Sequence, residues 1–307
     1  MQPGTIPCGI ALPQQMNHQE ESLSLIRNFA LRAEELEFDS LWVLEGILSK
    51  SSTLEPVTLL SFAAALTEDI RLGVAVIVLT LRNPLQLAKS LVTLDRLSGG
   101  RVTAGVGLGG RDHEALFGYS SERRVTRFVE ALGVMRALWR DQEASFEGHF
   151  WQFEGVPMEP KPLQKPTLPV WFGARAAPAV QRAVRLGDGF MGAGSASSHE
   201  FIQQVGWIRQ YLEETGREPG TFPISKRVYI AVDADRRRAE LRLREWFHGF
   251  YGNADLAARV SVFGSRHECL DRLGELVEGG AQHLMLNPVF DELDQMEILA
   301  AEVVPEL

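Results

Sequence analysis

Short runs of β-branched and aliphatic residues recur along the chain and alternate with stretches whose apolar residues fall three and four positions apart. The first pattern is typical of buried strands and the second of amphipathic helices. Eight strands are predicted, at Cys8–Leu12, Ser40–Leu44, Leu72–Leu79, Val102–Val106, Val170–Phe172, Gly189–Met191, Val228–Val232 and His283–Leu286. Because the intervening segments are long enough to hold helices, successive strands are expected to run parallel.

The helical pattern is clearest where Asn83 can cap a helix, Pro84 fits its first turn and Ser98–Gly100 ends it. Further helices are predicted at Glu21–Glu37, Glu122–Arg140, Ala177–Leu186, Glu200–Thr215, Ala234–Phe247, His267–Glu278 and Asp291–Val303. Eight strands alternating with helices favour an α/β fold of the (β/α)8 TIM-barrel type over an open doubly wound sheet. Residues 1–307 are expected to form one such domain, with insertion segments at Ser145–Pro169 and between the seventh and eighth strands.

Composition narrows the functional classes. The net charge of -9 disfavours binding to nucleic acid or to an anionic membrane, and we find neither a signal-peptide pattern nor a run of apolar residues long enough to span a bilayer. The two cysteines, Cys8 and Cys269, show no metal-binding or redox spacing, and the histidines are scattered. We therefore expect a cytoplasmic protein without a membrane span or a metal site.

The stretch RVTAGVGLGG, residues 101–110, contains G-x-G-x-x-G after a predicted strand. A dinucleotide-binding loop of this kind opens a helix at once and belongs to the first βαβ unit of its domain. Here the next helical pattern begins near Glu122, and three strand-helix units come first, so the dinucleotide interpretation is disfavoured. Two alternatives remain: the glycines accommodate neighbouring side chains, or they let a flat ligand approach the barrel rim at Gly107–Arg111.

The run LRNPLQLAKSLVTLDRLSGGRVTAGVGLGG, residues 81–110, resembles the bacterial luciferase-like family of flavin-dependent and F420-dependent oxidoreductases. Supporting motifs occur in family order: SLWVLEG at 40–46, RLGVAVIVL at 71–79, FEGVPMEPKP at 153–162, PVWFGA at 169–174, RLGDGF at 185–190 and HLMLNP at 283–288. The resemblance covers nearly the whole chain. It implies a TIM barrel that binds FMN or F420 at the carboxyl ends of its strands.

The resemblance also implies positions for the cofactor. Its ring would lie near Ala75, Val76 and Val78, where the Ala75–Val76 bond aligns with a non-prolyl cis peptide of the family. Gly107, Gly109 and Arg111 would lie at the rim nearby. The phosphate end is expected at two small-residue stretches that follow the fifth and sixth strands: Gly173, Ala174 and Arg175, and Gly192, Ala193, Gly194 and Ser195.

Acid-base chemistry is harder to assign because the chain departs from the family at one position. Many relatives have Glu-His or Asp-His at the end of the second strand, whereas this chain has Glu45-Gly46. Glu45 and His113 are the candidate catalytic residues, and the alternative role for Glu45 is to position a neighbour. Arg82 and Arg111 are candidate anion ligands. Lys226 is expected at the amino-terminal end of the barrel, away from the chemistry.

The predicted activity is hydride transfer with F420, or monooxygenation with reduced FMN, on a small organic substrate. Expected partners are a separate flavin or F420 reductase and a second copy of the chain, joined through the apolar stripe of EPVTLLSFAAAL at 55–66. Leu12, Leu44, Val78, Leu108 and Met191 would form an apolar mouth. Two alternatives are a non-catalytic flavin-binding sensor and, with less support, a metal-dependent barrel hydrolase.

Overall fold

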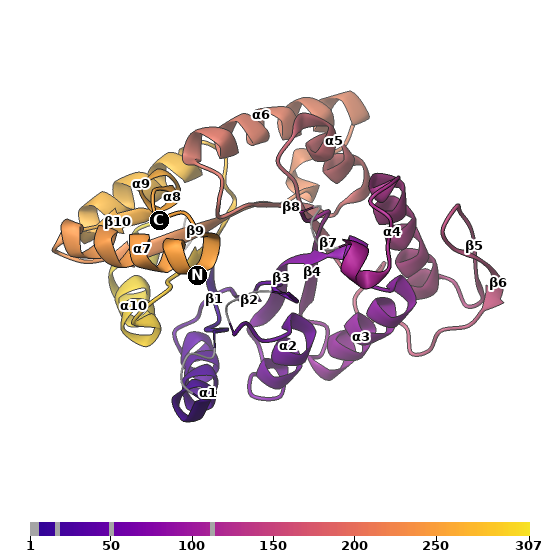
Figure 1. The fold of residues 1–307 in the computed structure, drawn as a ribbon, viewed down its shortest axis with the longest axis horizontal. Coiled ribbons are helices and arrows are strands. Elements are labelled where there is room, and N and C mark those ends of the chain that lie inside the picture. The colour runs from indigo at the N-terminus through magenta and orange to yellow at the C-terminus, as the bar shows by residue number, and fades with distance from the viewer. Residues whose placement is uncertain (1–5, 16–18, 49–51, 111–113) are drawn as a thin grey trace.

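Eight parallel strands close into a barrel in the computed structural model, which describes residues 6–15, 19–48, 52–110 and 114–307 (Figure 1). Around the barrel the strands follow the order β9, β11, β1, β2, β3, β4, β7, β8, and pairing of β8 with β9 completes the circle. Their bounds are β1 Cys8–Ala11, β2 Ser40–Val43, β3 Arg71–Val78, β4 Val102–Gly107, β7 Val170–Gly173, β8 Gly189–Gly192, β9 Ile224–Val232 and β11 His283–Asn287. The predicted TIM barrel is therefore confirmed, and each predicted strand overlaps one of these eight.

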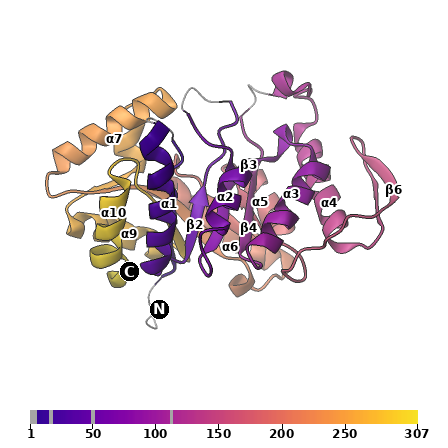
Figure 2. The same cartoon turned by 90° about the horizontal axis from the view of Figure 1, so that it is seen from below.

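Helices cover the outside of the barrel (Figures 1 and 2). The α3 helix, Pro84–Leu97, begins where predicted, because the Asn83 side chain accepts hydrogen bonds from the Leu85 and Gln86 N–H groups at 3.0 and 3.3 Å. The remaining helices are α1 Gln19–Glu35, α2 Pro56–Ala64, α4 Arg124–Arg140, α5 Ala177–Leu186, α6 Ser198–Thr215, α7 Arg236–Tyr251, α8 Leu256–Val260, α9 Arg266–Glu278 and α10 Glu292–Ile298.

Both predicted insertions contain strands that the sequence pattern did not indicate. In the first, β5, Ala144–Glu147, pairs antiparallel with β6, Gln152–Val156, and this hairpin lies at the edge of the molecule beyond α4 (Figure 1). In the second, β10, Val262–Gly264, pairs parallel with the last three residues of β9, Ile230–Val232. β9 itself begins at Ile224, four residues before the predicted Val228. The prediction began too late because the first half of the strand contains the polar residues Ser225, Lys226 and Arg227.

Two layers of side chains fill the barrel and the space around it, and a further cluster packs Tyr229 of β9 against α7, α8 and β10. The larger lies between the strands and the helices. A smaller cluster lies inside the barrel and is formed by Ala11, Trp42, Ala75, Trp171, Met191 and Met285, with Leu44 and Val76 packed against it. At the amino ends of the strands, the buried His283 ring is 2.7 Å from the Ser225 hydroxyl and 3.2 Å from the Ser40 hydroxyl, which closes that end of the barrel with polar contacts.

The apolar stripe of α2 is used within the chain. Leu59, Leu60 and Ala63 are buried in the core between strands and helices, while Phe62 remains partly exposed. The expected use of this stripe as a surface between two copies was wrong, because packing against the barrel already covers it. The two ends of the described chain meet on the opposite side from the strand carboxyl ends, where the Ile6 N–H donates to the Leu307 carbonyl at 3.3 Å (Figure 2).

Candidate active site

The carboxyl end of β3 has an irregular backbone that turns two successive side chains toward the barrel axis. The register with β4 shifts between Val74 and Ile77. As a result, Ala75 and Val76 both join the inner cluster, whereas Val74 and Ile77 face the outer core. The Ala75–Val76 peptide bond is cis, as the resemblance implied.

The glycines of RVTAGVGLGG are explained by the valines of β3. A Cβ atom at Gly107 would lie 2.6 Å from a methyl carbon of Val76, and one at Gly173 on the next strand would lie 3.1 Å from the other. Gly109 has a φ of +69° and faces Val78. The glycines therefore leave room for neighbouring side chains, as in the first of the two structural alternatives. The Val76 side chain therefore lies against Gly107 of β4 and Gly173 of β7 at the mouth of the barrel.

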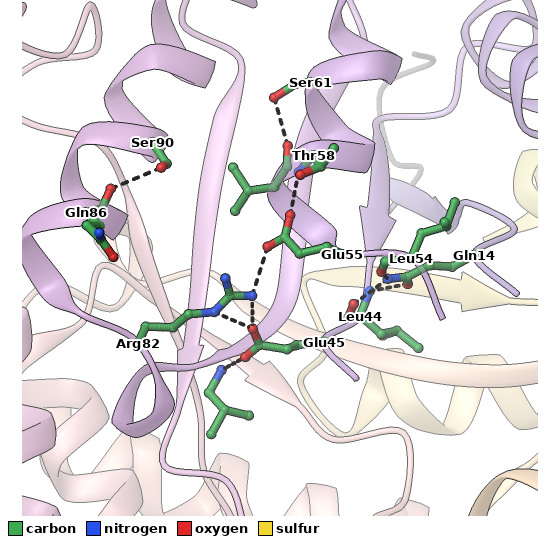
Figure 3. A network of polar contacts seen from close by, with 12 residues as sticks. Gln14, Leu44, Glu45, Leu54, Glu55, Thr58, Ser61, Arg82, Gln86 and Ser90 are labelled. Atoms are coloured by element: carbon green, nitrogen blue, oxygen red, sulfur yellow. Dashed lines mark hydrogen bonds and ion pairs between the residues drawn. The ribbon is translucent and has the colours of Figure 1, made fainter. Parts of the chain in front are cut away.

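Glu45 lies at the end of β2 inside a closed ionic network (Figure 3). Its buried carboxylate accepts from the Val78 N–H and from Arg82, which also contacts Glu55 at 2.9 Å. Burial raises the pKa of the Glu45 carboxyl, against the opposing effects of Arg82 and the Val78 N–H. The expectation that Arg82 is a free anion ligand was wrong, because two carboxylates already bind its guanidinium.

The same edge of the barrel is fixed by Gln14, which follows β1. Its side-chain amide donates to the Leu44 and Leu54 carbonyls, each at 2.6 Å, and its oxygen accepts from the Leu44 N–H at 2.7 Å (Figure 3). These bonds tie the ends of β1 and β2 to the segment before α2. Arg111 and His113 lie outside the described residues, and the rim beyond β4 is seen only to Gly110.

The two stretches expected at the phosphate end lie side by side. The exposed guanidinium of Arg175, after β7, donates to the Ser195 carbonyl and to Glu200, both at 3.3 Å. Ala174 is buried, and the adjacent α5 begins after Ala176 without a side-chain cap on its first N–H groups. In that first turn Pro178 has no N–H group, and the Ala179 N–H donates to the Ala176 carbonyl at 2.8 Å. After β8, a Cβ at Gly192 would lie 2.7 Å from the Phe201 ring.

Lys226 lies beside Gly192, the last residue of β8, which corrects its expected place at the amino-terminal end of the barrel. The difference arises because β8 has four residues and β9 has nine, so the stagger of the barrel brings the third residue of β9 level with the end of β8. The buried amine donates to the Ala193, Ala196 and Arg227 carbonyls at 2.7, 3.1 and 2.8 Å. It therefore holds the loop after β8 in place.

Sequence reasoning missed a second polar group, formed inside the barrel by Arg227, Tyr229 and Asn287. Arg227 Nε donates to the Asn287 side-chain oxygen at 2.9 Å, and the guanidinium lies 4.5 Å from the centre of the Tyr229 ring, whose hydroxyl it also contacts. A Cβ at Gly194 would lie 3.2 Å from Arg227 Cδ, so this group lies under the loop after β8. The alternation of polar residues at 225, 227 and 229 was the available signal.

Comparison with known proteins identifies the family. The family model described as luciferase-like monooxygenase matches residues 8–261. The chain belongs to this luciferase-like family. An uncharacterized protein of Mycobacterium tuberculosis (strain H37Rv) is 45% identical over 221 residues, which are 71% of this chain and 77% of the relative. An F420-dependent glucose-6-phosphate dehydrogenase of Kineococcus radiotolerans is 27% identical over 232 residues, which are 72% of this chain and 68% of the relative.

Solved structures agree on the fold of this luciferase-like protein. An F420-dependent secondary alcohol dehydrogenase, in complex with an F420-acetone adduct, superposes with a TM-score of 0.85 at 20% identity, over 98% of this chain and 99% of that one. The monooxygenase RslO1 of Streptomyces bottropensis gives a TM-score of 0.83 at 24% identity, with the same coverage. In the described ranges of the present chain, no helix has the length and apolar character needed to cross a membrane.

Proposed function

We propose that this luciferase-like protein is an oxidoreductase that uses F420 to transfer a hydride to or from a small organic substrate. Membership of the family supports the oxidoreductase class. Among the sequence relatives, F420-dependent glucose-6-phosphate dehydrogenases from Kineococcus radiotolerans and Beutenbergia cavernae, both 27% identical, support F420. The observation that carries the proposal is the position of Val76 at the barrel mouth, where Gly107 and Gly173 leave room for its two methyl groups.

The residues at the mouth fit a flat cofactor with an anionic tail. Val76, with Ala75 and Val78 beside it, would contact one face of the ring, and the glycines of β4 and β7 would keep Val76 in place by leaving room for its methyl groups. The exposed guanidinium of Arg175 and the loop after β8 would bind phosphate. When bound, the cofactor supplies the redox chemistry, and the protein binds and orients it.

Glu45 is proposed to position the ring-binding strand. Its carboxylate accepts from the Val78 N–H and is already held by Arg82, which leaves it poorly placed to exchange a proton with substrate. Glu45→Gln should therefore weaken cofactor binding without removing either limb of the pH-rate profile. His113 is the proposed proton-transfer residue, so His113→Ala should lower turnover at saturating cofactor.

A second candidate function is monooxygenation with reduced FMN supplied by a separate reductase. The structural likeness to the monooxygenase RslO1 supports it at the level of the shared fold. A non-catalytic flavin-binding role would share the same cradle and differ only in the absence of turnover. We also propose a homodimer, joined through a surface other than the buried stripe of α2.

The deciding experiment is a parallel titration of the purified protein with F420 and FMN, each oxidised and reduced, followed by absorbance and fluorescence. Selective binding of F420 is the expected result, and preference for reduced FMN would favour the monooxygenase. Binding of neither cofactor would overturn the proposal.

Two glycine variants connect this titration to the site. In Gly107→Ala the new methyl group would lie 2.6 Å from Val76, whereas in Gly110→Ala nothing among the described residues lies within 4 Å. Overpacking of this kind costs about 1–3 kcal/mol. Gly107→Ala should weaken cofactor binding at least tenfold and Gly110→Ala should leave it unchanged. Equal effects of the two variants on cofactor binding would show that Val76 and Gly107 do not belong to the cofactor site.

A further inference from the structure

Arg227 is a buried cation whose side chain faces the inside of the barrel. It pairs in register with Met285 of β11, and paired residues of parallel strands share a face of the sheet. Met285 belongs to the cluster inside the barrel, with Trp42 and Trp171. Arg227 is 8% exposed, and its guanidinium is oriented by Asn287 and Tyr229.

No carboxylate in the described part of the chain forms an ion pair with Arg227. The two other buried arginines of these residues, Arg124 and Arg127, both face Glu114, at 2.6 and 4.0 Å. Burying a charge without a partner is unfavourable, and a guanidinium cannot avoid the penalty because it stays charged. The barrel interior therefore holds a fixed positive charge that lacks a counter-ion.

One nitrogen of Arg227 remains available to a ligand. Nε donates to Asn287 and Nη2 to the Tyr229 hydroxyl, while Nη1 makes no hydrogen bond with the described residues. Asn287 also lines a pocket at the carboxyl ends of β1, β2 and β11. Most of the lining is apolar: Ala11, Leu12, Pro13, Leu44, Trp246, Pro288 and Val289. The pocket is small, about 40 Å³, and Arg227 is linked to it through its hydrogen bond to Asn287 without lining it.

We propose that Arg227 binds a carboxylate of the substrate inside the barrel, beside Asn287. The assignment to substrate rests on the proposed oxidoreductase function. A single free nitrogen and one unpaired positive charge suit a monoanion. A dianion would also face Glu292, which lines the pocket beside Asn287, and would gain nothing from Lys226, whose amine is held by three carbonyls.

The test compares carboxylic acids with their neutral amides, from acetate and acetamide to 3-phenylpropanoate and 3-phenylpropanamide. Binding is followed by tryptophan fluorescence, because Trp246 lines the pocket. The protein should bind at least one acid tenfold or more tightly than its amide, and Arg227→Met should abolish this preference. Arg227→Lys should retain part of it. Arg244→Gln, which removes a half-exposed arginine of α7, is the control and should change nothing.

Asn287→Asp provides a second variant that keeps Arg227. It places a carboxylate where the side-chain oxygen lies 2.9 Å from Arg227 Nε and so supplies an internal counter-ion. The acid preference should fall at least tenfold, and the midpoint of thermal unfolding should rise. If no acid binds better than its amide, or if the preference survives in both Arg227→Met and Asn287→Asp, the proposal is wrong.

A cofactor titration of the same variants separates this proposal from the proposed function. If Arg227→Met weakens F420 or FMN binding and leaves the acid preference intact, the anion belongs to the cofactor and the substrate assignment is overturned. If the unsubstituted protein binds neither cofactor, the proposed function fails. A preference for acids that depends on Arg227 would in that case still establish the carboxylate site.

Discussion

Arg124 and Arg227 are buried to nearly the same extent, 9% and 8% exposed, but their surroundings differ. Arg124, at the start of α4, pairs with buried Glu114 at 2.6 Å and donates to the Leu108, Gly109 and Gly110 carbonyls. Among the described residues, Arg227 donates hydrogen bonds to two neutral partners, Asn287 and Tyr229. A buried charge whose partners come from the same chain fixes architecture, whereas one that lacks a counter-ion points to a ligand.

The largest expected loss of stability follows from replacing Arg124, whose charge is balanced by Glu114 of the same chain. Arg124→Met leaves Glu114 buried, with its remaining arginine, Arg127, at 4.0 Å. Breaking a buried pair from one side costs about 3–5 kcal/mol. The free energy of unfolding, measured by urea denaturation, should fall by that amount, with Arg124→Lys recovering part of it. A loss of less than about 1 kcal/mol would mean that the pair contributes little.

A second test concerns Lys226, the buried cation next to Arg227. Burial, and then the charge of Arg227, lower the pKa of the Lys226 amine from 10.5 to about 7. Between these values the unfolded chain carries a proton that the folded chain lacks, so stability rises with pH by about 1.4 kcal/mol per unit, and the penalty is fully present below pH 7. Lys226→Met removes this contribution.

The measurement is urea denaturation of both proteins at pH 6, 7, 8 and 9. The difference in stability between Lys226→Met and the unsubstituted protein should favour the variant most at pH 6 and shrink steadily from pH 7 upward. Loss of the three hydrogen bonds to carbonyls shifts the whole difference by a constant and leaves its slope unchanged. Parallel curves across the range would show that the lysine stays charged in the folded state.

Much of the barrel follows from local patterns. The α3 helix begins at Asn83 because an asparagine oxygen caps it, and α5 occupies the predicted Ala177–Leu186 range. The start of β9 was missed because its polar side chains are buried by contacts from other strands, which a local pattern does not contain. For the same reason the sequence pointed to the glycines of β4 and to Val76 separately and did not show that Val76 packs against these glycines.

The candidate site divides in a similar way. Gly173, Arg175 and Ser195 were placed at one corner from their position after strands, and the structure brings them together. Whether an arginine is free or paired depends on residues distant in sequence. Arg82 was expected to be free and is bound by Glu45 and Glu55, whereas Arg227 was not considered and has no acidic partner among the described residues. The sequence shows which residues carry a charge, but only the fold shows which of these charges have a partner of opposite sign.

The smallest expected effect sharpens the comparison. Arg227→Met removes hydrogen bonds to Asn287 and Tyr229, but it also removes a buried charge without a counter-ion. Replacing an unfavourably buried charge by an apolar side chain of similar length is often neutral or stabilising, and residues kept for function commonly lower stability. The free energy of unfolding in the absence of ligand should change by less than about 0.5 kcal/mol or increase.

This result has meaning only beside Arg124→Met, which removes an equally buried guanidinium. If both variants lose about 3 kcal/mol or more, Arg227 stabilises the fold through its neutral partners, and its missing counter-ion needs no ligand. If only Arg124→Met is destabilised, the unpaired charge is not retained for stability. Carboxylate binding would then be the property that Arg227 confers, and Asn287→Asp would be expected to exchange that binding for stability.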